Sequence, residues 1–265
     1  MGAVTGPAAT RADRAEAGFW AAFARNIPTS DETRDTGAVP VAGGYAIALQ
    51  GTYLEYGLAV GSARALRADD LRIVDDFYAA RGIPSRLELH PAVVQRDAEL
   101  LAAWGYEPEF AVTILEREIS GPGTASGAVA IESMKNRRAA WIDLVVEGFA
   151  DTVDPAGHPR LRRATQVCAA AASDVFGARI DGRFAGGGAL AVIGDAALLL
   201  SASTLPEFRR RGVHTALIAA RLAGARARGA TYGFLKATNE SGSVPSARAA
   251  GFHAVYDRCR MRKST

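Results

Sequence analysis

One order of sequence signals occurs twice along this chain of 265 residues. In the first half, "YAARGIPSRLELHP" leads to "LLAAWGYEPEFAVTILERE", and in the second half "ARARGATYGFLKAT" leads to "SARAAGFHAVYDRCRMR". Each time a helical pattern ends at Ala-Arg-Gly, where Gly82 or Gly229 suits a left-handed helix end. A strand and a short helix follow, and the short helix ends at Gly105-Tyr106 or Gly251-Phe252, which lie 23 and 22 residues after the first glycine.

The matching order, spacing and helix ends predict an internal duplication. The alternative is that any mixed α/β chain produces helix, strand, helix and strand in turn. Between the halves, "EISGPGTASGAVA" at 118–130 is rich in glycine and small residues, which is typical of a linker. We therefore expect an α/β chain with a flexible N-terminus at 1–13, domains at 14–119 and 128–265, and a linker at 120–127.

The second half has the more regular pattern. Hydrophobic periodicity predicts helices over 134–150 and about 160–173, with a loop between them that contains Asp154-Pro155 and His158-Pro159. Strands are expected near 175–181, 183–193 and 196–205, the last two joined as a hairpin at Gly194-Asp195. The next helix has an apolar stripe at steps of four and three, which consists of Val213, Leu217, Ala220, Gly224 and Ala227.

Three consecutive arginines, Arg209, Arg210 and Arg211, stand directly before that last helix. A helix start carries unpaired N–H groups and a partial positive charge, so cations there are mildly repelled unless an anion is close by. Gly212 removes a side chain where the backbone must approach a ligand, and the successive N–H groups of the first turn suit a phosphate group. The pattern of strand, turn and arginine-glycine helix start therefore predicts a pyrophosphate site.

With this site in place, the second half resembles the GCN5-related N-acetyltransferase (GNAT) superfamily over about residues 128–262. The family motif Gln/Arg-x-x-Gly-x-Gly/Ala matches Arg209 to His214 except at its last place, where His214 replaces a small residue. Its ring must therefore point away from the phosphates, or the pocket must differ there. The segment "NESGSVPSARAAGF" at 239–252 also matches the family's next strand end and short helix.

The resemblance implies a mixed, mostly antiparallel sheet flanked by helices, and acetyl-CoA as the acyl donor. It places the pantetheine arm beside the strand end and the pyrophosphate on the amides of residues 210–215. The cofactor-binding residues that it implies are Ser203, Thr204, Leu205, Arg209, Arg210, Arg211, Gly212, Val213, His214, Thr215, Asn239 and Ser243.

The first half resembles a truncated copy of the same fold, so the whole chain is similar to tandem GNAT proteins. It lacks the arginine-glycine motif, and Asp69-Asp70 stand near the corresponding helix start. Carboxylates favour a helix start but repel phosphate. We expect this half to bind no CoA and to shape the structure or the substrate site.

The acid that many family members use to protonate the thiolate is a tyrosine four residues before the Gly-Phe glycine, and here that position is Ala247. Ser243, Ser246 and Tyr256 are the nearest candidates to replace it, and Tyr256 is equally compatible with packing in a strand. Glu147 is a candidate base or cation-binding residue, against the alternative of a solvated helix carboxylate. The four histidines are too scattered to form a metal site.

The predicted function is transfer of an acetyl group to the amine of a small molecule or peptide, by direct attack in a ternary complex. The alternative is an acyl-CoA-binding sensor that has lost the catalytic acid. The net charge of +3 does not demand nucleic acid, and the surplus of arginines at 206–230 has no interleaved aromatic residues. No apolar run is long enough for a membrane span. We expect a cytoplasmic monomer or homodimer without a metal.

Overall fold

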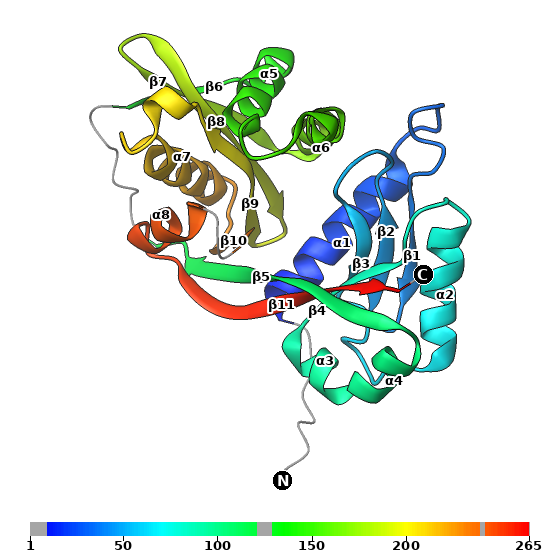
Figure 1. The fold of residues 1–265 in the computed structure, drawn as a ribbon. Helices are drawn as coiled ribbons and strands as arrows, with labels where there is room; N and C mark the ends of the chain where they lie inside the picture. Colours follow the sequence, from blue (N-terminus) through cyan, green and yellow to red (C-terminus); the bar gives the residue numbers. More distant parts are fainter. Residues whose placement is uncertain (1–9, 121–128, 239–241, 265) are drawn as a thin grey trace. The chain divides into compact units, whose positions relative to one another are not determined.

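The computed structural model describes residues 10–120, 129–238 and 242–264. The chain forms two compact units (Figure 1). The first unit comprises the described residues of Met1–Gln50, Leu54–Thr113 and Tyr256–Thr265, and the second comprises those of Gly51–Tyr53 and Ile114–Val255. The predicted linker at 120–127 lies almost wholly outside the described residues.

The strands that contribute to the first unit follow the order β1-β2-β3-β4-β11-β5. Neighbouring strands are antiparallel from β1 to β3, β3 and β4 are parallel, and β11 is antiparallel to β4. The elements are α1 (Arg11–Asn26), β1 (Gly37–Val41), β2 (Gly44–Ala48), β3 (Glu55–Leu58), α2 (Ala68–Ala79), β4 (Arg86–Leu89), α3 (Pro91–Arg96), α4 (Ala98–Ala103), β5 (Tyr106–Glu118) and β11 (His253–Lys263).

The second unit has the strand order β5-β10-β9-β8-β7-β6, with α5 and α6 on one face and α7 on the other (Figure 1). Its own elements are β6 (Ala130–Ser133), α5 (Arg138–Phe149), the 3-10 turn η1 (Pro155–Gly157), α6 (His158–Ala171), β7 (Asp174–Ile180), β8 (Arg183–Ile193), β9 (Ala196–Thr204), the 3-10 turn η2 (Pro206–Phe208), α7 (Val213–Ala227), β10 (Tyr232–Ala237) and α8 (Ser243–Ala249).

The two halves of the chain repeat one order of elements. The series α6-β7-β8-β9-α7-β10-α8-β11 corresponds to α1-β1-β2-β3-α2-β4-(α3, α4)-β5. Counterparts of β6 and α5 are missing from the described part of the first half, as expected of a truncated copy. The predicted class, a mixed and mostly antiparallel sheet flanked by helices, is confirmed.

The compact units differ from the predicted domain boundaries because the halves exchange their last strands. Residues 114–118 of β5 belong to the second unit, and residues 256–263 of β11 belong to the first. In the first unit, Cys259 to Arg262 pair with Leu89 to Arg86 of β4. Each half therefore completes a sheet that the other half begins.

The N-terminal segment is ordered earlier than predicted. Thr10 and Asp13 form a capping box at the start of α1, in which each side chain binds the other residue's backbone N–H. Residues 10–13 are therefore helix cap and first turn, whereas 1–9 lie outside the described residues.

The buried face of helix α7 differs from the predicted apolar stripe at two positions. Ala227 is exposed, whereas Arg221 is only 2% exposed. The buried guanidinium of Arg221 donates hydrogen bonds to the carbonyl oxygens of Leu217 (3.0 Å) and Leu200 (3.3 Å). These two bonds satisfy part of the hydrogen-bonding capacity of the guanidinium. Burial lowers the pKa of Arg221 to about 9.

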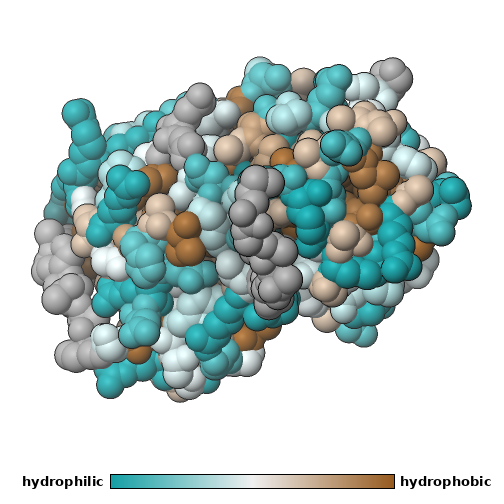
Figure 2. Space-filling model, turned by 90° about the horizontal axis from the view of Figure 1, so that it is seen from below, coloured by the Kyte–Doolittle hydropathy of each residue, from teal (hydrophilic) through white to brown (hydrophobic). Residues whose placement is uncertain are grey.

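Large hydrophobic side chains are mostly inside the two units. The exposed ones among the described residues are Tyr53, Ile73, Phe110 and Val255. Figure 2 shows that hydrophilic side chains cover most of the face seen from below, with hydrophobic residues in small groups between them. No helix in the described ranges combines the length and the apolarity that a membrane span needs.

Candidate functional site

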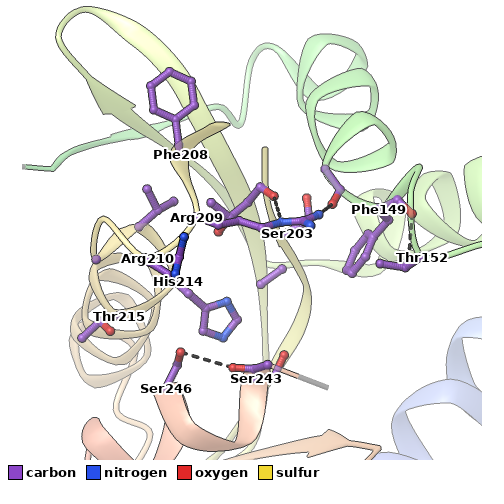
Figure 3. A pocket seen from close by; sticks show the side chains of 16 residues that line it. Phe149, Thr152, Ser203, Phe208, Arg209, Arg210, His214, Thr215, Ser243 and Ser246 are labelled. Atoms are coloured by element: carbon purple, nitrogen blue, oxygen red, sulfur yellow. Dashed lines mark hydrogen bonds between the residues drawn. The ribbon is translucent and has the colours of Figure 1, made fainter. Parts of the chain in front are cut away.

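A cavity of about 600 Å³ lies in the second unit, between the end of α5, the end of β9, the start of α7 and α8 (Figure 3). It is large enough for an extended small molecule. Its lining residues are Gly148, Phe149, Thr152, Ala202, Ser203, Thr204, Phe208, Arg209, Arg210, Gly212, Val213, His214, Thr215, Gly242, Ser243 and Ser246. Most of the residues predicted to bind a cofactor are therefore brought together in one place.

The start of α7 presents unused backbone donors to this cavity. Gly212 is the N-cap residue, has a left-handed φ of 79° and provides no side-chain cap. The first helical hydrogen bond runs from the Ala216 N–H to the Gly212 carbonyl. Within the described residues, the N–H groups of residues 210–215 have no hydrogen-bond partner. Such a row of donors at a helix start fits an anion.

The three arginines before α7 have different surroundings. Arg209 forms a two-pronged ion pair with Asp151, and Arg211 pairs with Asp181 at 3.2 Å. Arg210 lines the cavity and has no ion pair within the described residues. Arg211 is not among the lining residues, so the geometry favours Arg210 as the cation available to a bound anion.

Strand β9 separates from β10 beside the cavity. Their parallel pairing covers only Ala196 to Leu198, opposite Tyr232 to Phe234. On its other side, β9 pairs with β8 through a bulge, where Ser201 has a left-handed φ of 41°. The sheet thus opens where Ala202, Ser203 and Thr204 line the cavity.

Leu205 does not face the cavity as Ser203 and Thr204 do. It is only 7% exposed, and its N–H donates to the Ala185 carbonyl at 2.9 Å. The N–H of Leu205 is thereby engaged with β8, which leaves Ser203 and Thr204 as the strand-end residues of the site.

Helix α5 approaches β9 unusually closely at Gly148. A β-carbon on Gly148 would lie 2.4 Å from Ser203 Oγ. The same Ser203 hydroxyl donates to the Val145 carbonyl of α5 at 3.0 Å. Sequence reasoning missed Gly148, Phe149, Thr152 and Phe208 as lining residues, although a glycine inside the apolar helix "WIDLVVEGFA" is a signal of close backbone approach.

His214 lines the cavity, and in Figure 3 its ring is directed toward Ser246 of α8. His214 thus stands in the wall of the cavity, and both alternatives expected for it stay predictions. Burial and the neighbouring Arg221 charge lower the pKa of His214 to about 4, so the ring is neutral at pH 7. A neutral ring in the cavity wall can donate or accept a hydrogen bond without repelling the arginines.

The predicted catalytic residues are not gathered in one place. Ser243 and Ser246 line the cavity, whereas Glu147 is exposed and is not among the lining residues. Tyr256 belongs to the first unit, where its hydroxyl lies 2.6 Å from Thr10 Oγ1 and burial raises its pKa. Ala247 is fully buried in an apolar cluster. Asn239 lies outside the described residues.

The corresponding helix start in the first unit carries its own anion. The Asp70 carboxylate accepts hydrogen bonds from the Arg67 N–H at 2.8 Å and from both terminal nitrogens of Arg64 at 2.7 Å. The Arg64 guanidinium beside it holds the pKa of Asp70 below its usual value. At this helix start the chain's own carboxylate thus accepts from a backbone N–H and an arginine, and the prediction that this half binds no CoA stays a prediction.

The comparisons with known proteins agree with this geometry. Residues 138–252 match the model of the acetyltransferase (GNAT) family. This region contains α5, the cavity, α7 and α8, and ends at the Gly-Phe pair. No curated protein matches the chain in sequence.

Solved structures share the fold of the whole chain. A GCN5-related N-acetyltransferase from Kribbella flavida has a TM-score of 0.64 and 14% identity, with 99% of this chain and 97% of that chain covered. A related protein from Sphaerobacter thermophilus has a TM-score of 0.58 and 17% identity, with 96% and 93% covered. A tandem GNAT protein from the clavulanic acid biosynthesis pathway has a TM-score of 0.56 and 15% identity, with 97% and 96% covered.

Proposed function

Because residues 138–252 belong to the acetyltransferase (GNAT) family, we propose that this chain is an N-acetyltransferase. Its donor is acetyl-CoA, and its acceptor is the amine of a small molecule or peptide. The full-length similarity to a tandem GNAT protein supports the assignment of the fold, and the cavity of the second unit supports the assignment of the site.

The observation that carries the proposal is the row of N–H groups at residues 210–215, which have no partner among the residues that the structure describes, next to Arg210, which forms no ion pair with any of them. A diphosphate group supplies the acceptor oxygens and the negative charge that this corner lacks. Gly212 allows the phosphate oxygens to approach the backbone without a side chain in the way. Ser203 and Thr204 then border the pantetheine arm, as the strand opens beside them.

In the reaction, the acceptor nitrogen forms a bond to the acyl carbon, and the bond from that carbon to sulfur breaks. Backbone N–H groups near the β9 bulge polarise the carbonyl. The acceptor nitrogen loses one proton as the amide forms and the departing thiolate takes up one, and we assign this transfer to a relay through Ser246, since that residue lines the cavity. Roles for Tyr256 and Glu147 stay predictions, which Tyr256→Phe and Glu147→Gln would test.

A CoA-binding sensor is the second candidate. It is favoured by Ala247, which stands at the position of the family's usual acid and is fully buried. A methyl group there can pack but cannot donate a proton. Both candidates bind CoA, and only the enzyme turns it over.

Calorimetry with CoA and thiol release from acetyl-CoA against a panel of amines test the proposal together. We expect Arg210→Glu to weaken CoA binding about tenfold or more, and Arg211→Glu, a matched charge reversal outside the cavity lining, to change it less than threefold. Steady thiol release with one acceptor class supports the enzyme. Binding without release supports the sensor, and wild-type protein that does not bind CoA overturns both.

A further inference from the structure

Arg209 connects three segments around the cavity. Its terminal nitrogens lie 2.6 and 2.7 Å from the two carboxylate oxygens of Asp151, and one of them also donates to the Gly148 carbonyl at 3.3 Å. Its Nε donates to the Thr204 carbonyl at 3.4 Å. In Figure 3 the Arg209 side chain runs from the turn before α7 toward the end of α5. The guanidinium is thus occupied by protein acceptors.

The segments that Arg209 joins have different tasks in the site. Thr204 and Arg209 belong to the strand end and turn that lead into the first turn of α7. Gly148 and Asp151 belong to the end of α5 and the loop after it, where Phe149 and Thr152 form the opposite wall of the cavity. One side chain therefore connects the anion-binding turn with the opposite wall.

The Arg209–Asp151 pair is well aligned but partly open to solvent. The side chains are 40% and 47% exposed, and an ion pair at such a surface contributes little by itself, because holding two long side chains in one geometry costs entropy. A ligand that fixes the turn removes part of that cost in advance. The pair then becomes stronger when the turn is occupied.

We propose that Arg209 and Asp151 couple binding of the CoA diphosphate at the turn before α7 to the conformation of residues 148–152. Binding of the donor then orders the wall of the cavity that contacts the acceptor amine. The proposal rests on the proposed function. Arg209 and Asp151 are positioning residues in it, since both Asp151 oxygens are taken by Arg209 rather than by the acceptor. Coupling between two sites is reciprocal, so an acceptor that orders the wall also tightens CoA binding.

Hydrogen–deuterium exchange with CoA as the probe tests the coupling without a known acceptor. In the wild-type protein, saturating CoA slows exchange in residues 209–215 and also in residues 148–154. In Asp151→Asn, we expect slower exchange in residues 209–215 only. The matched control is Asp181→Asn, which removes the ion pair of the neighbouring Arg211 and should give the wild-type pattern.

Kinetics with an amine that the wild-type protein acetylates give a second readout. At saturating acetyl-CoA, we expect Asp151→Asn to raise KM for that amine about fivefold, with the Kd of CoA measured without amine within about twofold of wild type and kcat little changed. Asp151→Glu keeps the charge and should recover part of the loss. A merely structural role would instead lower the melting temperature and weaken the binding of CoA alone as well.

Two results would overturn the coupling. The first is protection of residues 148–154 by CoA in Asp151→Asn to the wild-type extent. The second is loss of CoA binding itself in Asp151→Asn, which would place Asp151 in donor binding. If the wild-type protein binds and turns over acetyl-CoA, either result contradicts the coupling but not the proposed function. If the wild-type protein does not bind CoA, the proposed function itself is wrong.

Discussion

The guanidinium of Arg258 lies 2.5 Å from the Glu16 carboxylate, although 242 residues separate the two in the chain. Arg258 also contacts Asp13 at 2.6 Å and Glu88 at 2.9 Å, and each of these side chains is at most 4% exposed. Helix α1, strand β4 and the end of β11 therefore meet at one buried cation in the first unit.

Replacing this cation should strongly destabilise the first unit. In Arg258→Met, three buried carboxylates lose their shared partner, and we expect the free energy of unfolding to fall by about 3–5 kcal/mol. Arg262→Met is the matched control, because Arg262 is exposed on the same strand and should change stability by less than about 0.5 kcal/mol. Urea denaturation measures both, and equal midpoints would contradict the prediction.

A methyl group at Gly148 should disturb both stability and the cavity. Because the new β-carbon would meet Ser203 Oγ at 2.4 Å, α5 must move away from β9, and we expect Gly148→Ala to cost about 1–3 kcal/mol and to weaken CoA binding. Gly18→Ala in α1 meets no atom within 4 Å and should stabilise the chain by about 0.5–1 kcal/mol. Thermal unfolding and CoA calorimetry on both variants check the contrast.

Acid should destabilise the fold through His214. Its pKa is about 4 in the folded protein, below the ordinary value of 6.5, so below pH 6.5 the unfolded chain takes up a proton that the folded chain does not. Stability is therefore lost as the pH falls from about 6.5 to 4, by at most about 1.4 kcal/mol per pH unit from this group. Urea unfolding of His214→Gln should show a shallower loss over this range, and parallel profiles would count against a buried neutral ring.

Two neighbouring aspartates in the first turn of α2 should differ in their contribution. Asp70 is buried and caps the helix with bonds from Arg67 and Arg64, so Asp70→Ala should cost about 1–2 kcal/mol. Asp69 has a side chain that is 79% exposed, and Asp69→Ala should cost less than about 0.5 kcal/mol. Chemical denaturation distinguishes them, and similar losses would show that the Asp70 cap is not what holds the helix start.

Local signals predicted the parts of the fold that depend on neighbouring residues. The hairpin between β8 and β9 turns at Gly194-Asp195 as predicted, since a tight turn needs only its own two residues. The start of helix α7 directly after Gly212 likewise depends only on neighbouring residues, since Gly212 is its N-cap residue. The site's turn could therefore be located from the sequence, because strand end, glycine and helix start are contiguous.

Contacts between distant segments could not be predicted in this way. The partner of Arg209 is Asp151, 58 positions away in a loop, and no periodicity relates the two. Arg221 occupies a buried position of α7, where a charged residue is rare. It is accommodated there because two backbone carbonyls lie within hydrogen-bonding distance of its guanidinium. Val255 and Tyr256 are consecutive residues of one strand but belong to different units. The alternation of apolar and polar residues along a strand does not indicate such a boundary.

The exchange of last strands has a consequence for how the chain matures on the ribosome. Strand β4 obtains its neighbour β11 only when residues 259–262 have been translated, although β4 itself ends at Leu89. Until these residues of β11 have emerged, β4 lacks this neighbour, so the first unit stays incomplete while the second half of the chain is being made.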